Sequence, residues 1–364
     1  MGAMARSSGT MGVRVLTTIG VLSALLAGNL ACGGGARGPA VEPADRIQIL
    51  DQAVAAVPGS VVTPISQADG ALTGPHFRLK FDRSTVSGTT YGMVDSRGYT
   101  DNQPHAAANG HEFIGLSSDT VNIYDTSKIA VSVVIDGAER PVPVAGSAFG
   151  FVVSVPVGHT ALLKVVDEGR AQTFDMRAGR RGSDAVVGYY PPRSLAWPKH
   201  SDNADFYVSR ATCDDPSTAG TGLKDACGFE VSFSLFGGTI DLQPWLPRLG
   251  WAPPGRIWVS TTAFIDVDPG LHTLMDVTFT LDPAKSFTLT LPDGTVSPGR
   301  IAEGADHMVH QPQGATLAFD APDSITGGVV TVQGLGTFTP SGVTWVKAPE
   351  AKQFQLTAKE PTAS

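Results

Sequence analysis

Val131-Ser132-Val133-Val134-Ile135-Asp136-Gly137 is the stretch that most directly predicts the fold, because a β-branched run ends in a hairpin-turn dipeptide. Upstream, residues 77–81 (Phe-Arg-Leu-Lys-Phe) alternate apolar and polar side chains, which is the period of a half-buried strand. Downstream, similar segments at 151–155, 161–166 and 172–176 recur about every ten residues. Short strands at this spacing, separated by turn residues, predict an antiparallel sandwich or barrel.

The second half of the chain repeats this order of segments. Four blocks correspond: 109–114 with 254–259, 127–137 with 284–294, 151–156 with 316–322, and 163–174 with 329–338. The repeat favours a tandem duplication, while convergence stays open because any two sandwiches repeat strands and Asp-Gly turns. We therefore predict an all-β protein with two tandem antiparallel β-sandwich (Ig-like) domains. Phe279 and Leu281, in a longer gap of the second half, predict an extra strand there.

Composition supports this class. The 364 residues include 42 Gly and 26 Pro, and only 16% are charged, against about 25% in average proteins. This disfavours a coiled coil or a helical bundle, and 42% apolar residues argue against disorder. The net charge of −8 argues against a nucleic-acid partner, which selects for basic surfaces.

The N-terminus has the pattern of a secretion signal. Arg6 and Arg14 supply positive charge, and the apolar stretch 15–28 is shorter than the roughly 20 residues of a membrane span. Asn29-Leu30-Ala31-Cys32 follows, and then three glycines. These residues resemble the lipobox of bacterial lipoproteins, although Asn29 stands where Leu is usual. The resemblance implies that Cys32 is acylated, becomes the first residue and tethers the protein to a membrane. An ordinary signal cut near Ala31, or an uncleaved anchor, stays open.

The chain is thus predicted to have six parts. They are a signal peptide (1–31), a Gly/Pro-rich tether (32–44), a short helix with a connecting segment (45–73), the first sandwich (74–179), the second sandwich with a disulfide loop and a Trp/Pro-rich segment (180–358), and a tail (359–364). The helix is predicted because Ile47, Leu50, Val54 and Val57 recur at helical spacing after a capping Asp45.

Removing Cys32 for acylation leaves two cysteines, Cys213 and Cys227. An exported protein with a single pair of cysteines is predicted to join them in a disulfide. A redox or metal site is the alternative, but it usually has two residues between the cysteines or histidines nearby.

Sequence motifs for catalysis are mostly missing. The chain has no phosphate-binding glycine loop, nucleophile elbow or zincin helix. His307 and His310 beside Glu303 or Asp306 have metal-like spacing, but a polar loop between strands is the favoured interpretation. Asp266 and Asp268 before Pro-Gly are interpreted as turn residues rather than a Ca²⁺ site. We therefore predict no catalytic residue, no metal and no cofactor.

Three of the five tryptophans fall within 245–258. Trp258 is assigned to the core, whereas Trp245 and Trp251, with Arg248, are candidates for a binding surface, since exposed Trp stacks on sugars and proteins. Packing of these tryptophans between a loop and the core is the alternative. The stretch resembles exported actinobacterial proteins of unknown role, and this resemblance implies no activity.

The predicted function is that of a non-enzymatic binding module of the cell envelope, exported and anchored through Cys32 to the extracytoplasmic face of a bacterial membrane. Its expected partners are the membrane and either an envelope protein or a cell-wall glycan. One alternative is a cell-wall or carbohydrate-binding accessory protein that uses Trp245 and Trp251. Another is a carrier of lipid or a small ligand, which would require an internal cavity.

Overall fold

The computed structural model describes residues 38–359, with gaps at 51–52, 95–99, 102, 144–149, 191, 197–204, 214–228, 236–238, 270–277, 305–306, 310–312, 340–342 and 346–348. Strands dominate this part of the chain, and the helix found there is the single-turn α1 (Pro283–Ser286). The all-β prediction is therefore confirmed. In the described residues, no helix has the length and apolar character needed to cross a membrane.

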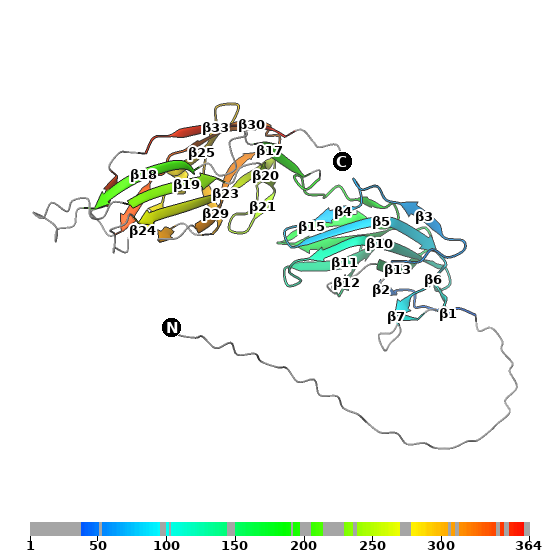
Figure 1. Cartoon of the computed structure of the whole chain (residues 1–364). Helices are drawn as coiled ribbons and strands as arrows, with labels where there is room; N and C mark the ends of the chain where they lie inside the picture. Colours follow the sequence, from blue (N-terminus) through cyan, green and yellow to red (C-terminus); the bar gives the residue numbers. More distant parts are fainter. Residues whose placement is uncertain are drawn as a thin grey trace, which may run out of the picture. The chain divides into compact units, whose positions relative to one another are not determined.

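The first domain contains two antiparallel sheets (Figure 1). One has the strand order β2-β13-β10-β5-β3, with β4 beside β5, and the other has the order β12-β11-β14-β15-β16. Their bounds are β2 (Ile47–Leu50), β3 (Val61–Pro64), β4 (Ala71–Thr73), β5 (Phe77–Ser87), β10 (His111–Ile123), β11 (Ile129–Ile135), β12 (Ala138–Val142), β13 (Gly150–Pro156), β14 (Ala161–Asp167), β15 (Arg170–Asp175) and β16 (Arg180–Arg181). Two small sheets accompany them. One has the order β1-β9-β6, formed by β1 (Ala40–Val41), β9 (His105–Ala106) and β6 (Thr89–Thr90), and the other pairs β7 (Met93–Val94) with β8 (Thr100–Asp101).

A single apolar core lies between these two sheets. Phe77 and Phe81 enter it from β5, and Val133, Leu163 and Phe174 enter it from the opposite sheet. Burial along β14 alternates strictly, as expected for a strand with one face on a core. The first domain is thus a β-sandwich.

The predicted helix at the start of this domain is wrong. Residues 47–50 form strand β2, which pairs with β13 so that Ile47 lies opposite Val153. Ile47 and Ile49 pack on the sandwich core, while Leu50 joins a second cluster with Val54 on the other face of the sheet. Because both faces are covered, cross-strand pairing outweighs the helical spacing of the apolar residues. The segment 45–73 therefore supplies β2, β3 and β4 to the first domain.

The second domain is built on a ladder of strands that runs without a break in the order β26-β25-β30-β33-β17-β20-β23-β19-β18-β32, with β29 between β23 and β27. Bounds are β17 (Arg193–Ala196), β18 (Asp205–Cys213), β19 (Phe229–Leu235), β20 (Thr239–Gln243), β21 (Trp245–Leu246), β22 (Gly250–Trp251), β23 (Arg256–Pro269), β24 (Thr278–Leu281), β25 (Phe287–Thr290), β26 (Val296–Pro298), β27 (Arg300–Gly304), β28 (His307–Val309), β29 (Gln313–Pro322), β30 (Gly327–Val332), β31 (Gly336–Thr339), β32 (Val343–Trp345) and β33 (Lys352–Ala358). Leu195, Val259, Phe287 and Leu356 from this ladder share one core. The extra strand predicted from Phe279 and Leu281 is β24, where both side chains are buried.

Strand pairing supports the internal repeat. β10 pairs with β13 as β23 pairs with β29, and the ladder β12-β11-β14 corresponds to β26-β25-β30. A glycine with positive φ precedes each long strand, Gly110 at 76° and Gly255 at 74°. The last block departs from the repeat, because β15 pairs with β14 whereas β31 pairs with β24.

Candidate functional site

The two candidate tryptophans face each other across a short hairpin. Trp245 of β21 pairs in register with Trp251 of β22, and both side chains are half-buried. The Trp251 indole N–H donates a hydrogen bond of 2.9 Å to the carbonyl oxygen of Glu168. The Arg170 guanidinium lies 5.2 Å from the centroid of the same indole, and the Tyr189 ring lies edge-on at 6.5 Å.

Arg248 of this hairpin also has a partner. Arg248 is exposed, and its guanidinium donates to the carbonyl oxygen of Gly304 at 2.6 Å, which ties the hairpin to β27. The Trp245 ring lies edge-on to the His76 ring at 5.4 Å. These contacts use the groups with which a sugar or protein would hydrogen-bond or stack, so they favour a structural role for the three residues. Their binding role stays a prediction.

The hairpin also covers Trp258, which is only 4% exposed. Leu246 and Ala252 pack on Trp258 together with Ala302 and Ala318. The Trp258 indole N–H donates to the Gly250 carbonyl oxygen at 3.0 Å. Trp258 thus belongs to a satellite cluster beneath the hairpin, whereas its neighbours Ile257 and Val259 face the main core.

A hydrogen-bonded pair, His76 and Asp167, joins the turn before β5 to the end of β14. The Asp167 side chain is 1% exposed, and it accepts the His76 backbone N–H at 2.8 Å while its other oxygen lies 2.7 Å from His76 Nδ1. A Cβ on Gly74 would lie 2.6 Å from the carboxylate, so the turn before His76 requires glycine. Burial raises the pKa of Tyr189, and the nearby Asp167 charge raises it further. Sequence spacing carries no signal for this pair, because the partners are 91 residues apart.

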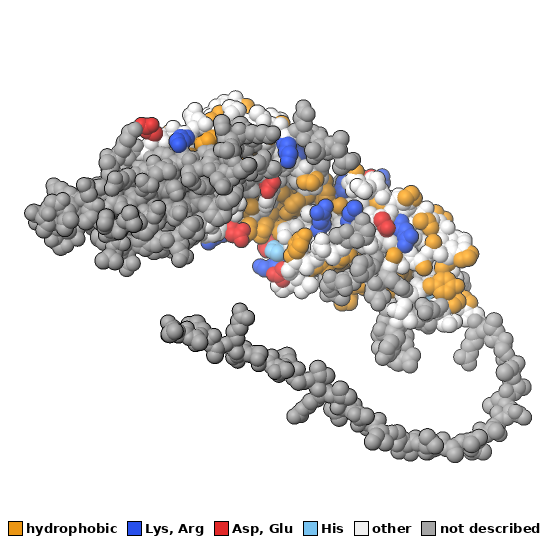
Figure 2. Space-filling view, viewed as in Figure 1, with side chains coloured by type: hydrophobic (Ala, Val, Ile, Leu, Met, Phe, Trp, Pro, Cys, Tyr) orange, Lys and Arg blue, Asp and Glu red, His pale blue; other side chains and the backbone are white. Residues whose placement is uncertain are grey.

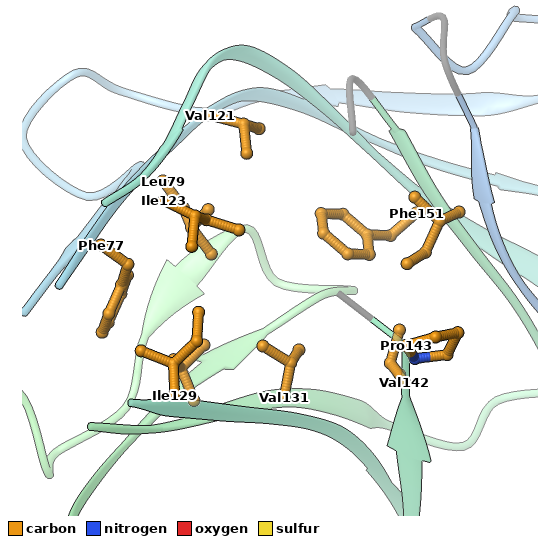
Figure 3. A pocket seen from close by; sticks show the side chains of 11 residues that line it. Phe77, Leu79, Val121, Ile123, Ile129, Val131, Val142, Pro143 and Phe151 are labelled. Carbon is orange, nitrogen blue, oxygen red and sulfur yellow. The ribbon is translucent and has the colours of Figure 1, made fainter. Parts of the chain in front are cut away.

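An apolar slot opens between the sheets of the first domain (Figure 3). Every side chain that lines the slot is apolar: Ile49, Phe77, Leu79, Val121, Ile123, Ile129, Val131, Val142, Pro143, Phe151 and Val165. The empty space measures about 350 Å³ when the open solvent beside it is counted, but only about 20 Å³ of it admits the centre of a water molecule. One water requires about 10–15 Å³ on the second scale. The slot is therefore apolar and has room for little more than one water molecule.

The two sides of this sandwich are closed differently. On one side, the Arg181 side chain donates to the Ala71 carbonyl oxygen at 3.2 Å, and the Ser84 hydroxyl donates to that of Met176 at 2.6 Å. The slot lies toward the other side, between the edge strands β2 and β12. There the Arg140 guanidinium reaches the Asp45 carbonyl oxygen at 3.3 Å.

Several slot residues, among them Phe77, Leu79, Val131 and Val165, lie in segments that the sequence predicts to be strands, but their pattern does not mark them as the lining of a slot. A strand pattern shows which side chains point inward, not whether opposing side chains fill the space between the sheets. Outside the slot, apolar and polar side chains intermingle on the viewed face of the first domain (Figure 2).

The predicted lipidation and disulfide fall largely outside the described residues. Cys32 precedes the first described residue, Cys227 lies in the gap at 214–228, and Cys213 is described only as the last residue of β18. Both assignments stay predictions.

The two weak metal motifs lie at least partly on strands. His307 lies on β28, and Asp266 and Asp268 lie within β23 rather than in a turn, because β19 pairs with them. In the described part of the chain, no group of three or more His, Cys, Asp or Glu side chains is placed to hold a metal ion.

Comparison of the chain with protein-family models, with curated proteins and with solved structures found no match.

Proposed function

We propose that this chain is an exported bacterial lipoprotein that serves the cell envelope as a non-enzymatic binding module. Acylated Cys32 holds it on the extracytoplasmic face of a membrane, and the residues between Cys32 and β1 act as a tether. The predicted tether of residues 32–44 is too long, because Ala40 and Val41 form β1, which pairs with β9. The observation that carries the binding role is the apolar slot of the first β-sandwich.

The chemistry of the slot supports binding rather than catalysis. Its lining offers apolar side chains and so supplies neither a nucleophile nor a proton carrier. The transfer of apolar surface from water into such a space is favourable by about 25 cal/mol of free energy per Å². A site of this kind holds its ligand by shape and burial, which is how ligand pockets commonly gain affinity.

The N-terminal sequence supports the anchor. Each buried CH₂ of an acyl chain contributes about 0.8 kcal/mol, and stable anchoring needs about two chains. The net charge of −8 gives little attraction to anionic lipids, so membrane attachment depends on Cys32.

Metabolic labelling with a clickable palmitate analogue tests the anchor. The wild-type protein and a Cys213→Ala control are expected to take up the label, and Cys32→Ala is expected to lose it. A wild-type protein without label, or a label that survives Cys32→Ala, would refute the proposal.

A further inference from the structure

We propose that the small sheet β1-β9-β6 is a membrane-contact surface, whose outer face rests on the headgroup region of the bilayer that holds Cys32. This inference rests on the proposed anchor and names the part of the folded chain that meets the membrane. β1 is the first strand of the described chain, and Figure 1 shows β1 and β6 at the same end of the first domain.

The sheet is fixed to the first domain. β1 pairs in parallel with β9, and the Glu42 N–H that follows donates to the Ala106 carbonyl oxygen at 2.8 Å. The Glu42 carboxylate lies 2.7 Å from Nδ1 of the buried His105 and 3.4 Å from Nε of Arg46. The chain that leads from Cys32 therefore joins the folded domain at β1.

One face of the sheet points outward. Val41, Ala106 and Thr89 lie opposite one another across the three strands, so their side chains share a face. Val41 is 70% exposed, whereas Thr90, which faces the other way, is 3% exposed. Tyr91, two residues after Thr89, is 38% exposed. This end of the domain thus presents an aliphatic and an aromatic side chain to water.

The segments around these side chains carry little charge. Residues 38–44, 88–94 and 103–110 contain no Lys or Arg and one carboxylate, Glu42, which already contacts Arg46 and His105. In Figure 2, hydrophobic side chains are visible at the end of the first domain where Figure 1 labels β1 and β6. A tyrosine and aliphatic side chains without charged neighbours suit the membrane–water interface, where tyrosine is enriched.

The length of chain before β1 keeps this surface near the bilayer. Seven residues, 33–39, separate Cys32 from Ala40. At about 3.3–3.6 Å per residue, β1 lies at most about 29 Å from Cys32. Because the anchor makes contact with the bilayer an intramolecular event, a weak attraction is enough to populate it.

The edge of β1 is poorly suited to a protein partner that adds a strand. β1 has two residues, and Pro39 and Pro43 flank it. A short edge bordered by prolines, which have no N–H, offers few hydrogen bonds to an added strand. The bilayer is therefore the occupant that the sheet and the chain before it favour.

Quenching of an introduced tryptophan by brominated lipid tests the contact. The acylated full chain with Tyr91→Trp is reconstituted in neutral phosphatidylcholine vesicles whose acyl chains carry bromine near the headgroups. Tyr124→Trp is the matched control. Tyr124 is 67% exposed and follows the end of β10, a 13-residue strand about 40 Å long, whereas Ser87, just before β6, lies opposite Phe113 near its start.

Emission of the five native tryptophans is subtracted by use of the parent protein. We expect bromine to quench the emission added by Tyr91→Trp at least threefold more than that added by Tyr124→Trp. Equal quenching in the two variants, or none in either, would overturn the inference.

Charge on the outer face gives a second test. In the Tyr91→Trp protein, Val41→Asp is expected to lower bromine quenching at least twofold, because a carboxylate resists transfer out of water. Val296→Asp, at a 55% exposed position of the second domain, should leave quenching unchanged. Val41→Ser, which adds no charge beside Glu42 and so spares the pairing of β1, should lower it as well. Unchanged quenching in both Val41 variants would contradict the contact.

A nickel-chelating lipid separates this inference from the proposed anchor. A polyhistidine tag in place of Cys32 holds the mature chain on the same vesicles without acylation. Bromine quenching there, combined with palmitate labelling that fails at Cys32, would refute the anchor and support the surface, whereas no quenching with either attachment would overturn the surface alone. Shielding of the introduced tryptophan from acrylamide without bromine quenching would indicate contact with another protein copy and would overturn the assignment to the bilayer.

Discussion

Gly115 lies in the middle of β10, at a position where the first domain has no room for a side chain. A Cβ there would lie 2.6 Å from one methyl of Val54 and 3.2 Å from the Val54 Cβ. The apolar cluster that contains Val54, Leu50 and Phe113 is thus packed directly on the backbone of the sheet.

Gly115→Ala is therefore expected to destabilise the first domain by about 1–3 kcal/mol, the usual cost of overpacking. Gly88→Ala is the matched control, because its Cβ would meet open space and its φ is not positive. Hydrogen exchange of β5 and β10 amides measures the change. Equal protection of these amides in the two variants would contradict the packing described for Gly115.

The Glu112 carboxyl makes the stability of the first domain depend on pH in the acid range. Burial opposes ionisation of its carboxyl, but the Gly158 N–H at 2.7 Å and the Arg177 guanidinium at 2.6 Å outweigh it, so the pKa is lowered. A lowered pKa in the folded state contributes stability that is present above the unfolded pKa of about 4.3 and is lost as the pH falls through the folded value.

In the Glu112→Gln variant, the free energy of unfolding should therefore fall less steeply than in the wild type between about pH 5 and pH 3. Urea unfolding followed by circular dichroism at several pH values gives the slope. The variant should be less stable than the wild type at pH 7 and nearly equal to it in acid. A constant difference across that range would show that the ion pair does not titrate as described.

Two strands, β11 and β2, show which sequence patterns predict secondary structure correctly and which do not. In β11 the β-branched residues and the Asp136-Gly137 turn gave the strand and its hairpin correctly, since both signals are local. In β2 the helical spacing of Ile47, Leu50 and Val54 predicted a helix, which is wrong. The segment is a strand because its pairing with β13 and its apolar contacts on both faces depend on residues far away in the sequence.

The contribution of the hairpin β21–β22 to the stability of the second domain can be measured directly. Leu246 is 3% exposed and packs on Trp258, so Leu246→Ala should cost the second domain about 2–5 kcal/mol. Val296→Ala, at a 55% exposed position, should cost less than about 0.5 kcal/mol. All five tryptophans lie at residue 197 or later, so tryptophan fluorescence in urea reports on this domain. Similar midpoints for both variants would show that the hairpin does not stabilise the domain.

For the whole molecule, the sequence predicted the class, the repeat and the extra strand β24, because these depend on residue patterns within short segments. It did not predict that the second domain would form one continuous ladder through β17 and β33, or that the sheets of the first domain would leave a slot. Both features depend on how segments far apart in the sequence meet. The sequence did not predict the Asp167–His76 pair for the same reason.

We propose that the two β domains are exported and held at a membrane by an acylated Cys32. The most direct measurement is the intact mass of the protein purified from the membrane fraction of a bacterial expression host that processes lipoproteins. We predict a chain that begins at Cys32 and carries the mass of a diacylglyceryl group. A chain that begins at another residue, or that begins at Cys32 without acyl mass, would contradict it.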